Sequence, residues 1–168
     1  MKLKLILILL VLNPIINYGQ ISTIKSAEIS FNFVAKDVDG TISGFSSDSQ
    51  IDLNAIENSK FKGTVSVKTI KTGIFLRDWA LKGSKYFNEE LHPKLLFEST
   101  AIQKTAKGFT VQGILTIKAI EKPLSISFIK NGKQLIGTAT LNTSDYGINI
   151  KKQDEDNTVN VSLSFTLN

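Results

Sequence analysis

The last ten residues of the chain alternate strictly between apolar and polar side chains, and this alternation restricts the fold more than any other feature. In residues 159–168 every odd position is apolar and every even position is polar. Successive side chains of a β-strand point to opposite faces, so the segment is expected to be a strand with one buried and one solvated face.

The same period of two recurs along most of the chain. It predicts eight strands, at residues 28–36, 41–54, 60–70, 94–103, 108–119, 122–131, 133–143 and 158–168. The short connections imply an antiparallel meander. Asn131-Gly132 is the favoured pair for a type I′ hairpin, and Glu121-Lys122-Pro123 is a weaker turn signal. Eight such strands avoid exposed edges by closing into a barrel, so the expected fold class is all-β.

Residues 73–93 interrupt this period. Ile74, Trp79 and Leu81 lie at mixed helical spacings, and Pro93 disfavours helix in the residue before it. The segment is therefore expected to form one or two short helices across a mouth of the barrel.

The N-terminus has the pattern of a secretory signal. Two lysines precede the unbroken apolar run 5–12, which is too short to span a bilayer, since that takes roughly 20 residues. We expect residues 1–19 to be a signal peptide cleaved after Gly19, and residues 20–168 to form a single domain. The expected location is the bacterial periplasm or the exterior of the cell.

Composition narrows the possible partners. Without Lys2 and Lys4, 18 basic residues remain against 15 acidic ones, a net charge of +3 spread along the chain. This is too mild to predict nucleic-acid binding, although it permits weak, transient attraction to anionic membrane surfaces. The chain has no cysteine, which excludes disulfides and thiol chemistry.

The sequence offers little for catalysis. His92 is the only histidine and is followed by proline, so we expect a loop residue rather than a catalytic base. The carboxylates do not cluster at metal-ligand spacing, and no catalytic or metal site and no cofactor is predicted. Arg77-Asp78 is the one polar pair that draws attention: it either ties the irregular segment to a neighbouring loop or contacts the polar head of a ligand.

The irregular segment and the strands around it resemble the YceI-like family. Residues 72–81, TGIFLRDWAL, resemble that family's TG-x-x-x-RD-x-H-L stretch, and 97–100, FEST, its F-x-S-T. Residues 113–118, GILTIK, are similar to its G-x-L-T-I strand, and 145–147, DYG, to its D-F-G. These similarities follow the family's order over nearly all of residues 20–168.

The resemblance implies a lipocalin-like, eight-stranded antiparallel barrel with an elongated apolar pocket for a polyisoprenoid or an isoprenoid quinone. It brings no catalytic residues. Members of the family often pair, which leaves a homodimer open. Ala80 stands where the family usually has His, His92 where it usually has Tyr, and Ala119 where it often has Gly. These departures affect polar head-group contacts more than the apolar pocket.

The expected lipid contacts are apolar side chains on the inward strand faces and in the irregular segment. They are Phe31, Phe33, Phe45, Phe61, Val65, Val67, Ile74, Phe75, Trp79, Phe87, Phe97, Val111, Leu115, Ile126, Phe128 and Phe165. An eight-stranded barrel either fills its interior with side chains or holds one small ligand. The two hypotheses are therefore an exported lipid-binding protein, for transport, storage or stress response, and a filled barrel that serves as an interaction or stress-response module. An enzyme has the least support.

Overall fold

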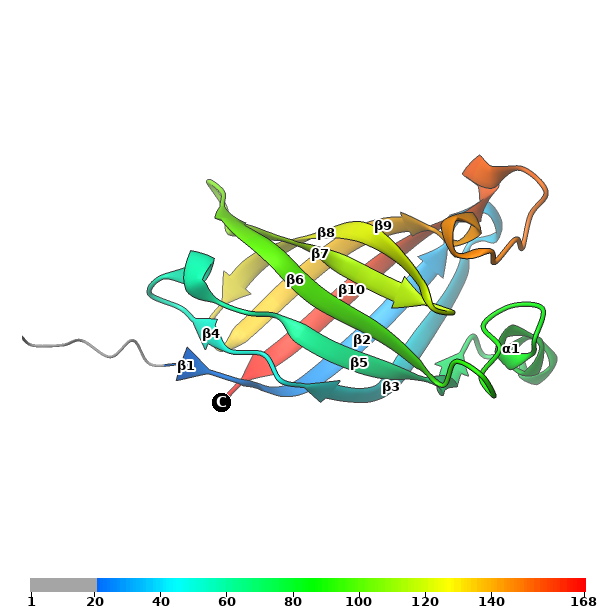
Figure 1. Cartoon of the computed structure of the whole chain (residues 1–168), viewed down its shortest axis with the longest axis horizontal. Helices are drawn as coiled ribbons and strands as arrows, with labels where there is room; N and C mark the ends of the chain where they lie inside the picture. Colours follow the sequence, from blue (N-terminus) through cyan, green and yellow to red (C-terminus); the bar gives the residue numbers. More distant parts are fainter. Residues whose placement is uncertain (1–20) are drawn as a thin grey trace, which may run out of the picture.

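Eight antiparallel strands close into a barrel. The computed structural model describes residues 21–168, and Figure 1 shows the strands wound around the long axis of the molecule. The barrel strands are β2 (Ile24–Phe33), β3 (Val38–Ser47), β5 (Lys62–Lys71), β6 (Lys94–Lys104), β7 (Phe109–Ile117), β8 (Ile120–Asn131), β9 (Gln134–Asn142) and β10 (Thr158–Leu167). Their order around the barrel is β10-β2-β3-β5-β6-β7-β8-β9. The predicted fold class is confirmed.

The alternating C-terminal segment closes the barrel. Along β10, Val161 pairs with Phe31 of β2 on one side and with Ala139 of β9 on the other. All three side chains belong to the inward-facing set, as the alternation predicts. Because β10 has a partner on both sides, its backbone has no exposed edge.

The predicted strand 41–54 is interrupted. β3 ends at Ser47, and the chain resumes extended structure only in β4 (Ile51–Asp52), which pairs with β1 (Ile21–Ser22) in a small separate sheet. Side chains divert the backbone between the two strands: the Ser47 hydroxyl accepts from the Ser49 amide at 3.1 Å, and the Ser49 hydroxyl accepts from the Lys62 amide at 3.0 Å. Such local serine hydrogen bonds compete with a strand ladder.

Two hairpins differ from the turns predicted for them. Lys118 and Ala119 both have positive φ, 53° and 61°, between the paired residues Ile117 and Ile120, so the type I′ turn lies there. The expected turn at Glu121-Lys122-Pro123 is part of β8 instead. At the next hairpin Asn131 pairs with Gln134, so Gly132 and Lys133 are the central residues. Only Gly132 has positive φ, which is the type II′ pattern.

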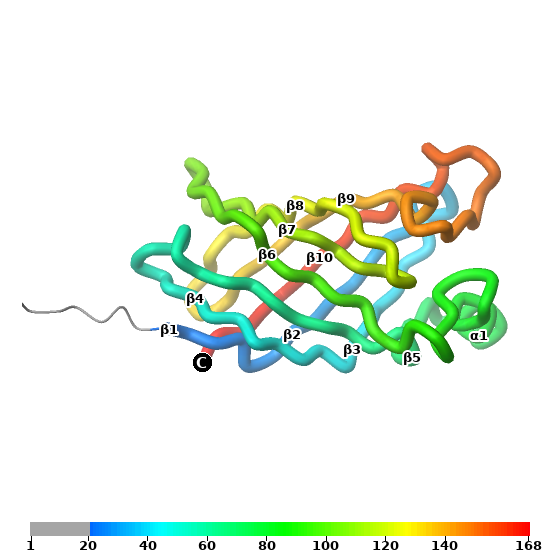
Figure 2. Tube along the Cα trace, viewed as in Figure 1, coloured from blue at the N-terminus to red at the C-terminus, as the bar shows by residue number. Residues whose placement is uncertain are grey.

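The irregular segment contains the one α-helix among residues 21–168, α1 (Phe75–Lys82). After it the chain folds back on the helix end, where the amides of Phe87 and Asn88 donate to the carbonyls of Leu81 and Gly83. Short 3-10 helices occupy other connections: η1 (Val34–Lys36), η2 (Ile56–Asn58), η3 (Thr143–Tyr146) and η4 (Asp154–Asn157). The trace in Figure 2 shows α1 and the segment after β9 at one end of the barrel, with β1 and β4 at the other.

Candidate functional site

The barrel is packed solid toward the end that carries β4 and η2. Ile51 and Ile56 cover this end, and the rings beneath them stack closely. Phe128 lies 5.5 Å from Phe61, 5.4 Å from Phe109 and 5.8 Å from Phe165, measured between ring centroids. These aromatic pairs form a floor across the barrel, and we call Phe61, Phe109, Phe128 and Phe165 the aromatic floor.

Above the aromatic floor the barrel is hollow. A cavity of about 420 Å³ extends from the floor to the end where α1 lies. This volume falls within the range of small-molecule sites, about 300–1,000 Å³. The barrel is therefore filled in one part and open in the other, so neither of the two interiors expected for eight strands describes it completely.

Inward-facing side chains of the hollow part keep contact with solvent. Phe31, Phe97, Leu115 and Val161 point into the barrel and are only partly buried, whereas Phe128 in the floor is 2% exposed. A side chain that faces the inside of a closed barrel can retain such exposure only because the space in front of it is empty. Partial burial thus marks the cavity wall.

Eleven of the sixteen predicted lipid contacts lie in this wall or its floor: Phe31, Phe33, Phe45, Phe61, Val65, Phe87, Phe97, Leu115, Ile126, Phe128 and Phe165. The structure adds further wall residues from the same strand faces, among them Ile29, Leu95, Leu124, Leu141 and Val161. The alternation that identified the first set also covers Ile29, Leu124 and Val161, and could have found them.

The other five predicted contacts lie elsewhere. Val67 and Val111 are fully buried between packed elements and do not reach the cavity. Ile74, Phe75 and Trp79 are 54%, 79% and 71% exposed, so their side chains face solvent. Apolar character suggested the interior for these residues, but the other side of α1, with Arg77, Ala80 and Leu81, faces the cavity.

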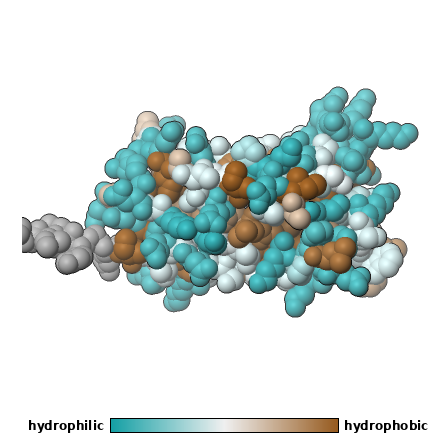
Figure 3. Space-filling view, viewed as in Figure 1, coloured by the Kyte–Doolittle hydropathy of each residue, from teal (hydrophilic) through white to brown (hydrophobic). Residues whose placement is uncertain are grey.

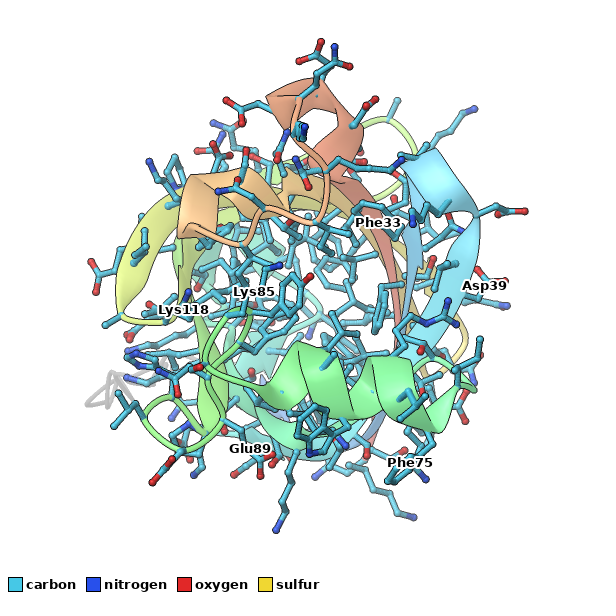
Figure 4. The ribbon with its side chains drawn as sticks, turned by 90° about the vertical axis from the view of Figure 1, so that its right-hand side faces the viewer. Phe33, Asp39, Phe75, Lys85, Glu89 and Lys118 are labelled. Atoms are coloured by element: carbon cyan, nitrogen blue, oxygen red, sulfur yellow. The ribbon has the colours of Figure 1, made fainter. Side chains whose placement is uncertain are left out.

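Figure 4 looks onto the α1 end of the barrel. The helix crosses the lower part of the barrel opening. Phe75 lies on the side of the helix away from the opening, and Lys85 lies over the opening. Leu81 and Phe87 pack against Ile42, Val67 and Ile70, which holds the helical segment to β3 and β5.

Arg77 and Asp78 fix the start of α1 to the end of β5. Thr72 donates through both its amide and its hydroxyl to Asp78 Oδ1, and the amide distance is 2.7 Å. Arg77 Nε donates to Thr72 Oγ1 at 2.7 Å, and its Nη2 donates to the Thr72 carbonyl at 2.8 Å. The predicted structural tie is present, and its partner is Thr72, six residues before Asp78.

The hydrogen bond from the Thr72 hydroxyl is the main reason that the pKa of Asp78 lies below its ordinary value. The Thr72 amide and the charges of Lys82 and Arg77 act in the same direction, against partial desolvation. The carboxylate is thus stabilised in its charged form.

The charged residues of the cavity wall are basic. They are Lys36 at the end of η1, Arg77, and Lys62, which forms a 2.8 Å ion pair with Glu98. Among the described residues that line the cavity, none is an aspartate or a glutamate. Polar atoms of a bound molecule near Arg77 or Lys36 would therefore meet hydrogen-bond donors, which suits carbonyl, hydroxyl or anionic oxygen atoms.

Within residues 21–168, no three His, Cys, Asp or Glu side chains come together as a metal site would require. His92, partly buried, follows the turn after α1, where its amide donates to the Asn88 carbonyl at 2.8 Å. Among the helices that the structure describes, none has the length and hydrophobicity needed to cross a membrane.

The face seen in Figure 3 is hydrophilic over most of its area, with hydrophobic residues exposed in small separate groups. The main hydrophobic cluster of the described residues lies inside the barrel, around Phe61, Phe128 and Phe165. For the part of the molecule described, the cavity above the aromatic floor is the site best suited to hold an apolar molecule.

Solved structures with the same architecture come from several bacteria. The chain is similar to BcnA of Burkholderia cenocepacia, with a TM-score of 0.68 and 19% identity, over 84% of this chain and 94% of that one. It is also similar to the YCEI protein of Campylobacter jejuni, with a TM-score of 0.67 and 17% identity, over 78% and 85%. A polyisoprenoid binding domain from Saccharophagus degradans, implicated in plant cell wall breakdown, has a TM-score of 0.55 and 10% identity, over 88% and 96%. At these identities the likeness concerns the fold.

Sequence comparison gives closer relatives of shorter overlap. A UPF0312 protein of Photorhabdus laumondii is 34% identical over 92 residues, 55% of this chain and 44% of that protein. A UPF0312 protein of Serratia proteamaculans is 28% identical over 87 residues, 52% of this chain and 45% of that protein. The matched region thus spans less than half the length of these relatives. The profile of the YceI-like domain matches residues 21–168, which is the whole described barrel. The chain therefore belongs to the YceI-like family.

Proposed function

We propose that this protein is an exported carrier that holds an isoprenoid lipid or quinone in the barrel cavity and performs no chemistry on it. The observation that carries the proposal is the apolar cavity of about 420 Å³ above the aromatic floor. The name of the Saccharophagus degradans domain, which describes a polyisoprenoid binding domain of this fold, supports the ligand class.

The volume suggests how much of a ligand is enclosed. If each methylene-sized group takes roughly 30 Å³, about the share of a water molecule in the liquid, the cavity holds about 14 such groups. This corresponds to about three isoprene units. Burial contributes about 0.8 kcal/mol per methylene, so a chain of this length can bind tightly with few polar contacts.

The polar end of the ligand would lie at the α1 end of the cavity, near Arg77 and Lys36. Arg77 donates hydrogen bonds to Thr72 through Nε and one Nη2 hydrogen, and the other N–H groups of its guanidinium are available to a ligand oxygen. In this proposal Arg77 has two functions: it holds α1 in place and it orients the ligand.

The direct test is to purify the protein from bacteria, extract it with organic solvent and identify bound lipids by mass spectrometry. Binding of added farnesol, which has three isoprene units, is measured by equilibrium dialysis. We expect an isoprenoid in the extract or stoichiometric binding of farnesol. If no lipid copurifies and farnesol does not bind, the carrier proposal fails, and an interaction or stress-response module without a lipid ligand takes its place.

Adjacent positions of β10 provide a matched pair of variants. Val161→Trp places a large side chain into the cavity, whereas Ser162→Trp places the same side chain on the outer face. We expect Val161→Trp to weaken farnesol binding at least tenfold and Ser162→Trp to leave it within twofold of the wild type. Equal affinities for the two variants would show that farnesol binds outside the cavity.

A further inference from the structure

The outer face of α1 carries an exposed apolar patch beside the cavity. Phe75 is 79% exposed, Leu76 73% and Trp79 71%, and Ile74, just before the helix, is 54% exposed. We call these four residues the α1 patch. Aromatic and large aliphatic side chains at such exposure are not needed for the fold, and a contiguous apolar patch on a soluble surface marks an interaction site.

The helix has two apolar sides with different surroundings. Ala80 and Leu81 face the cavity, whereas Phe75, Leu76 and Trp79 face solvent. With 100° between successive residues, positions 75, 76 and 79 fall on one side and positions 77, 80 and 81 on the other. The helix, which is 8 residues or about 2.2 turns long, therefore lies between the solvent and the cavity.

The segment that contains the α1 patch has an excess of positive charge. Residues 68–94 contain six basic residues and three acidic ones, of which Asp78 is held by Thr72. Lys68, Lys71, Lys85 and Lys94 are exposed. A short helix with Trp, Phe and Leu on one face and lysines around it has the composition of segments that lie in the interface of anionic membranes.

The shape of this region favours a membrane over a second copy of the chain. The α1 patch has an area on the order of 500 Å², since an exposed aromatic side chain contributes roughly 150–250 Å². A stable dimer needs about 800 Å² from each partner. Figure 1 shows α1 at one tip of an elongated molecule, where a partner protein would find little further surface, whereas a lipid interface needs no complementary shape.

We propose that the α1 patch inserts into the interfacial region of an anionic lipid bilayer and brings the cavity opening to the membrane surface. Membrane docking is a property of the outer helix face and can be measured without a cavity ligand. Exchange of lipid between bilayer and cavity is the step that rests on the proposed function.

Trp79 is the only tryptophan of the chain, so its fluorescence reports on the patch directly. Vesicles of phosphatidylglycerol and phosphatidylethanolamine are added to the full protein. We expect a blue shift of Trp79 emission and quenching by brominated lipids, because the indole leaves water. The expected shift is absent with phosphatidylcholine vesicles at moderate salt, since the lysines then have no anionic partner.

The variant Phe75→Ser with Leu76→Ser keeps Trp79 as the reporter. Both side chains are exposed, so the variant should fold as the wild type does, which circular dichroism verifies. We expect its partition into the anionic vesicles to fall at least tenfold. Each replaced side chain would otherwise bury several methylene-sized groups in the bilayer, and each such group contributes to binding. Ile129→Ser, at a half-exposed apolar residue on β8, is the control and should bind like the wild type.

Three results would overturn the proposal: no change in Trp79 emission with anionic vesicles, equal vesicle binding by the double variant and the Ile129→Ser control, or a concentration-dependent dimer without vesicles that the double variant abolishes. The last result would assign the α1 patch to a second copy. Farnesol binding by the double variant, measured with farnesol added from ethanol, separates membrane docking from lipid binding in the cavity. Farnesol binding should persist even where membrane docking fails.

Discussion

Gly137 lies directly opposite Phe128 in the β8–β9 ladder, and the Phe128 ring occupies the space that a side chain at position 137 would need. A Cβ on Gly137 would lie 2.5 Å from Cε1 of Phe128. The ring cannot retreat, because it is stacked among the other members of the aromatic floor. The glycine thus makes the dense packing of the floor possible.

We therefore expect Gly137→Ala to lower the free energy of unfolding by about 1–3 kcal/mol, the usual cost of overpacking a core. Thr138→Ala, at the next and exposed position, is the control and should change it by less than about 0.5 kcal/mol. Urea unfolding followed by circular dichroism measures both. A Gly137→Ala protein as stable as the control would mean that the floor has room to relax.

In the Lys118-Ala119 turn, by contrast, a substitution is expected to stabilise the protein. Both residues adopt left-handed backbone conformations, which cost an L-residue roughly 1–2 kcal/mol and glycine almost nothing. Glycine also gains freedom in the unfolded chain, which offsets part of this. We expect Ala119→Gly to raise the free energy of unfolding by about 0.5–1 kcal/mol.

The comparison for this turn is Ala101→Gly in β6, where the backbone is extended and the same replacement should lower stability by about 0.5–1 kcal/mol. Thermal unfolding of the two variants side by side makes the test. Destabilisation by Ala119→Gly would contradict the assigned turn geometry.

The tie between Asp78 and Thr72 should depend on pH. The pKa of Asp78 is lowered in the folded protein, so its contribution to stability is fully present above the unfolded-state pKa of about 3.9 and is lost as pH falls through the folded value. The group is partly solvated, so the contribution is about 1 kcal/mol or less. Lowering the pH should reduce the hydrogen-exchange protection factors of the α1 amides more than those of the β7 amides.

Asp78→Asn removes the charge while it keeps the size of the side chain. We expect faster exchange in α1 for this variant at neutral pH, and no additional opening of α1 relative to β7 as the pH is lowered. If the variant retained the pH dependence of the wild type, another group would be responsible.

Asn157 is fully buried and organises the segment between β9 and β10. Its Oδ1 accepts from the amides of Ile150 and Lys151, at 2.9 and 2.8 Å, and its Nδ2 donates to the carbonyls of Lys151 and Gln153, at 3.1 and 2.8 Å. Asn157→Ala leaves these partly buried backbone groups without their side-chain partners, so we expect a loss of about 1–2 kcal/mol in the free energy of unfolding.

The same variant should loosen the backbone around Lys151 and Lys152, so we expect faster trypsin cleavage after these lysines, and the cleavage rate is a local measurement. Asn160→Ala, on the outer face of β10, is the control, because its side chain forms a single exposed hydrogen bond with Thr140. Cleavage at equal rates in both variants would show that Asn157 does not hold the segment.

The sequence by itself determined the barrel. The alternation placed all eight strands within a few residues of their positions, apart from the break after Ser47 and the earlier start of β2. It succeeded because the period of two depends only on local backbone geometry and on which face meets water. The motifs around residues 72–100 identified the family because they consist of neighbouring residues, which can be recognised without knowledge of the tertiary structure.

The division of the inward face into floor and cavity was decided by the tertiary structure. Phe31 and Phe128 follow the same alternation, yet Phe31 lines open space and Phe128 is locked in a stack. Alternation states whether a side chain points inward but not its height along the barrel axis, which depends on strand tilt and on what covers each end. Ile51 and Ile56 cover one end because the chain leaves β3 early.

The orientation of α1 was likewise beyond the sequence. Apolar residues occupy both sides of this short helix, so no hydrophobic face stands out. Thr72 decides which side is turned inward, because its hydrogen bonds with Arg77 and Asp78 fix the helix about its axis. Alternation and motifs thus determined an all-β barrel of the YceI-like family, whereas contacts between distant or differently oriented segments decided where the barrel is hollow and which residues of α1 meet the solvent.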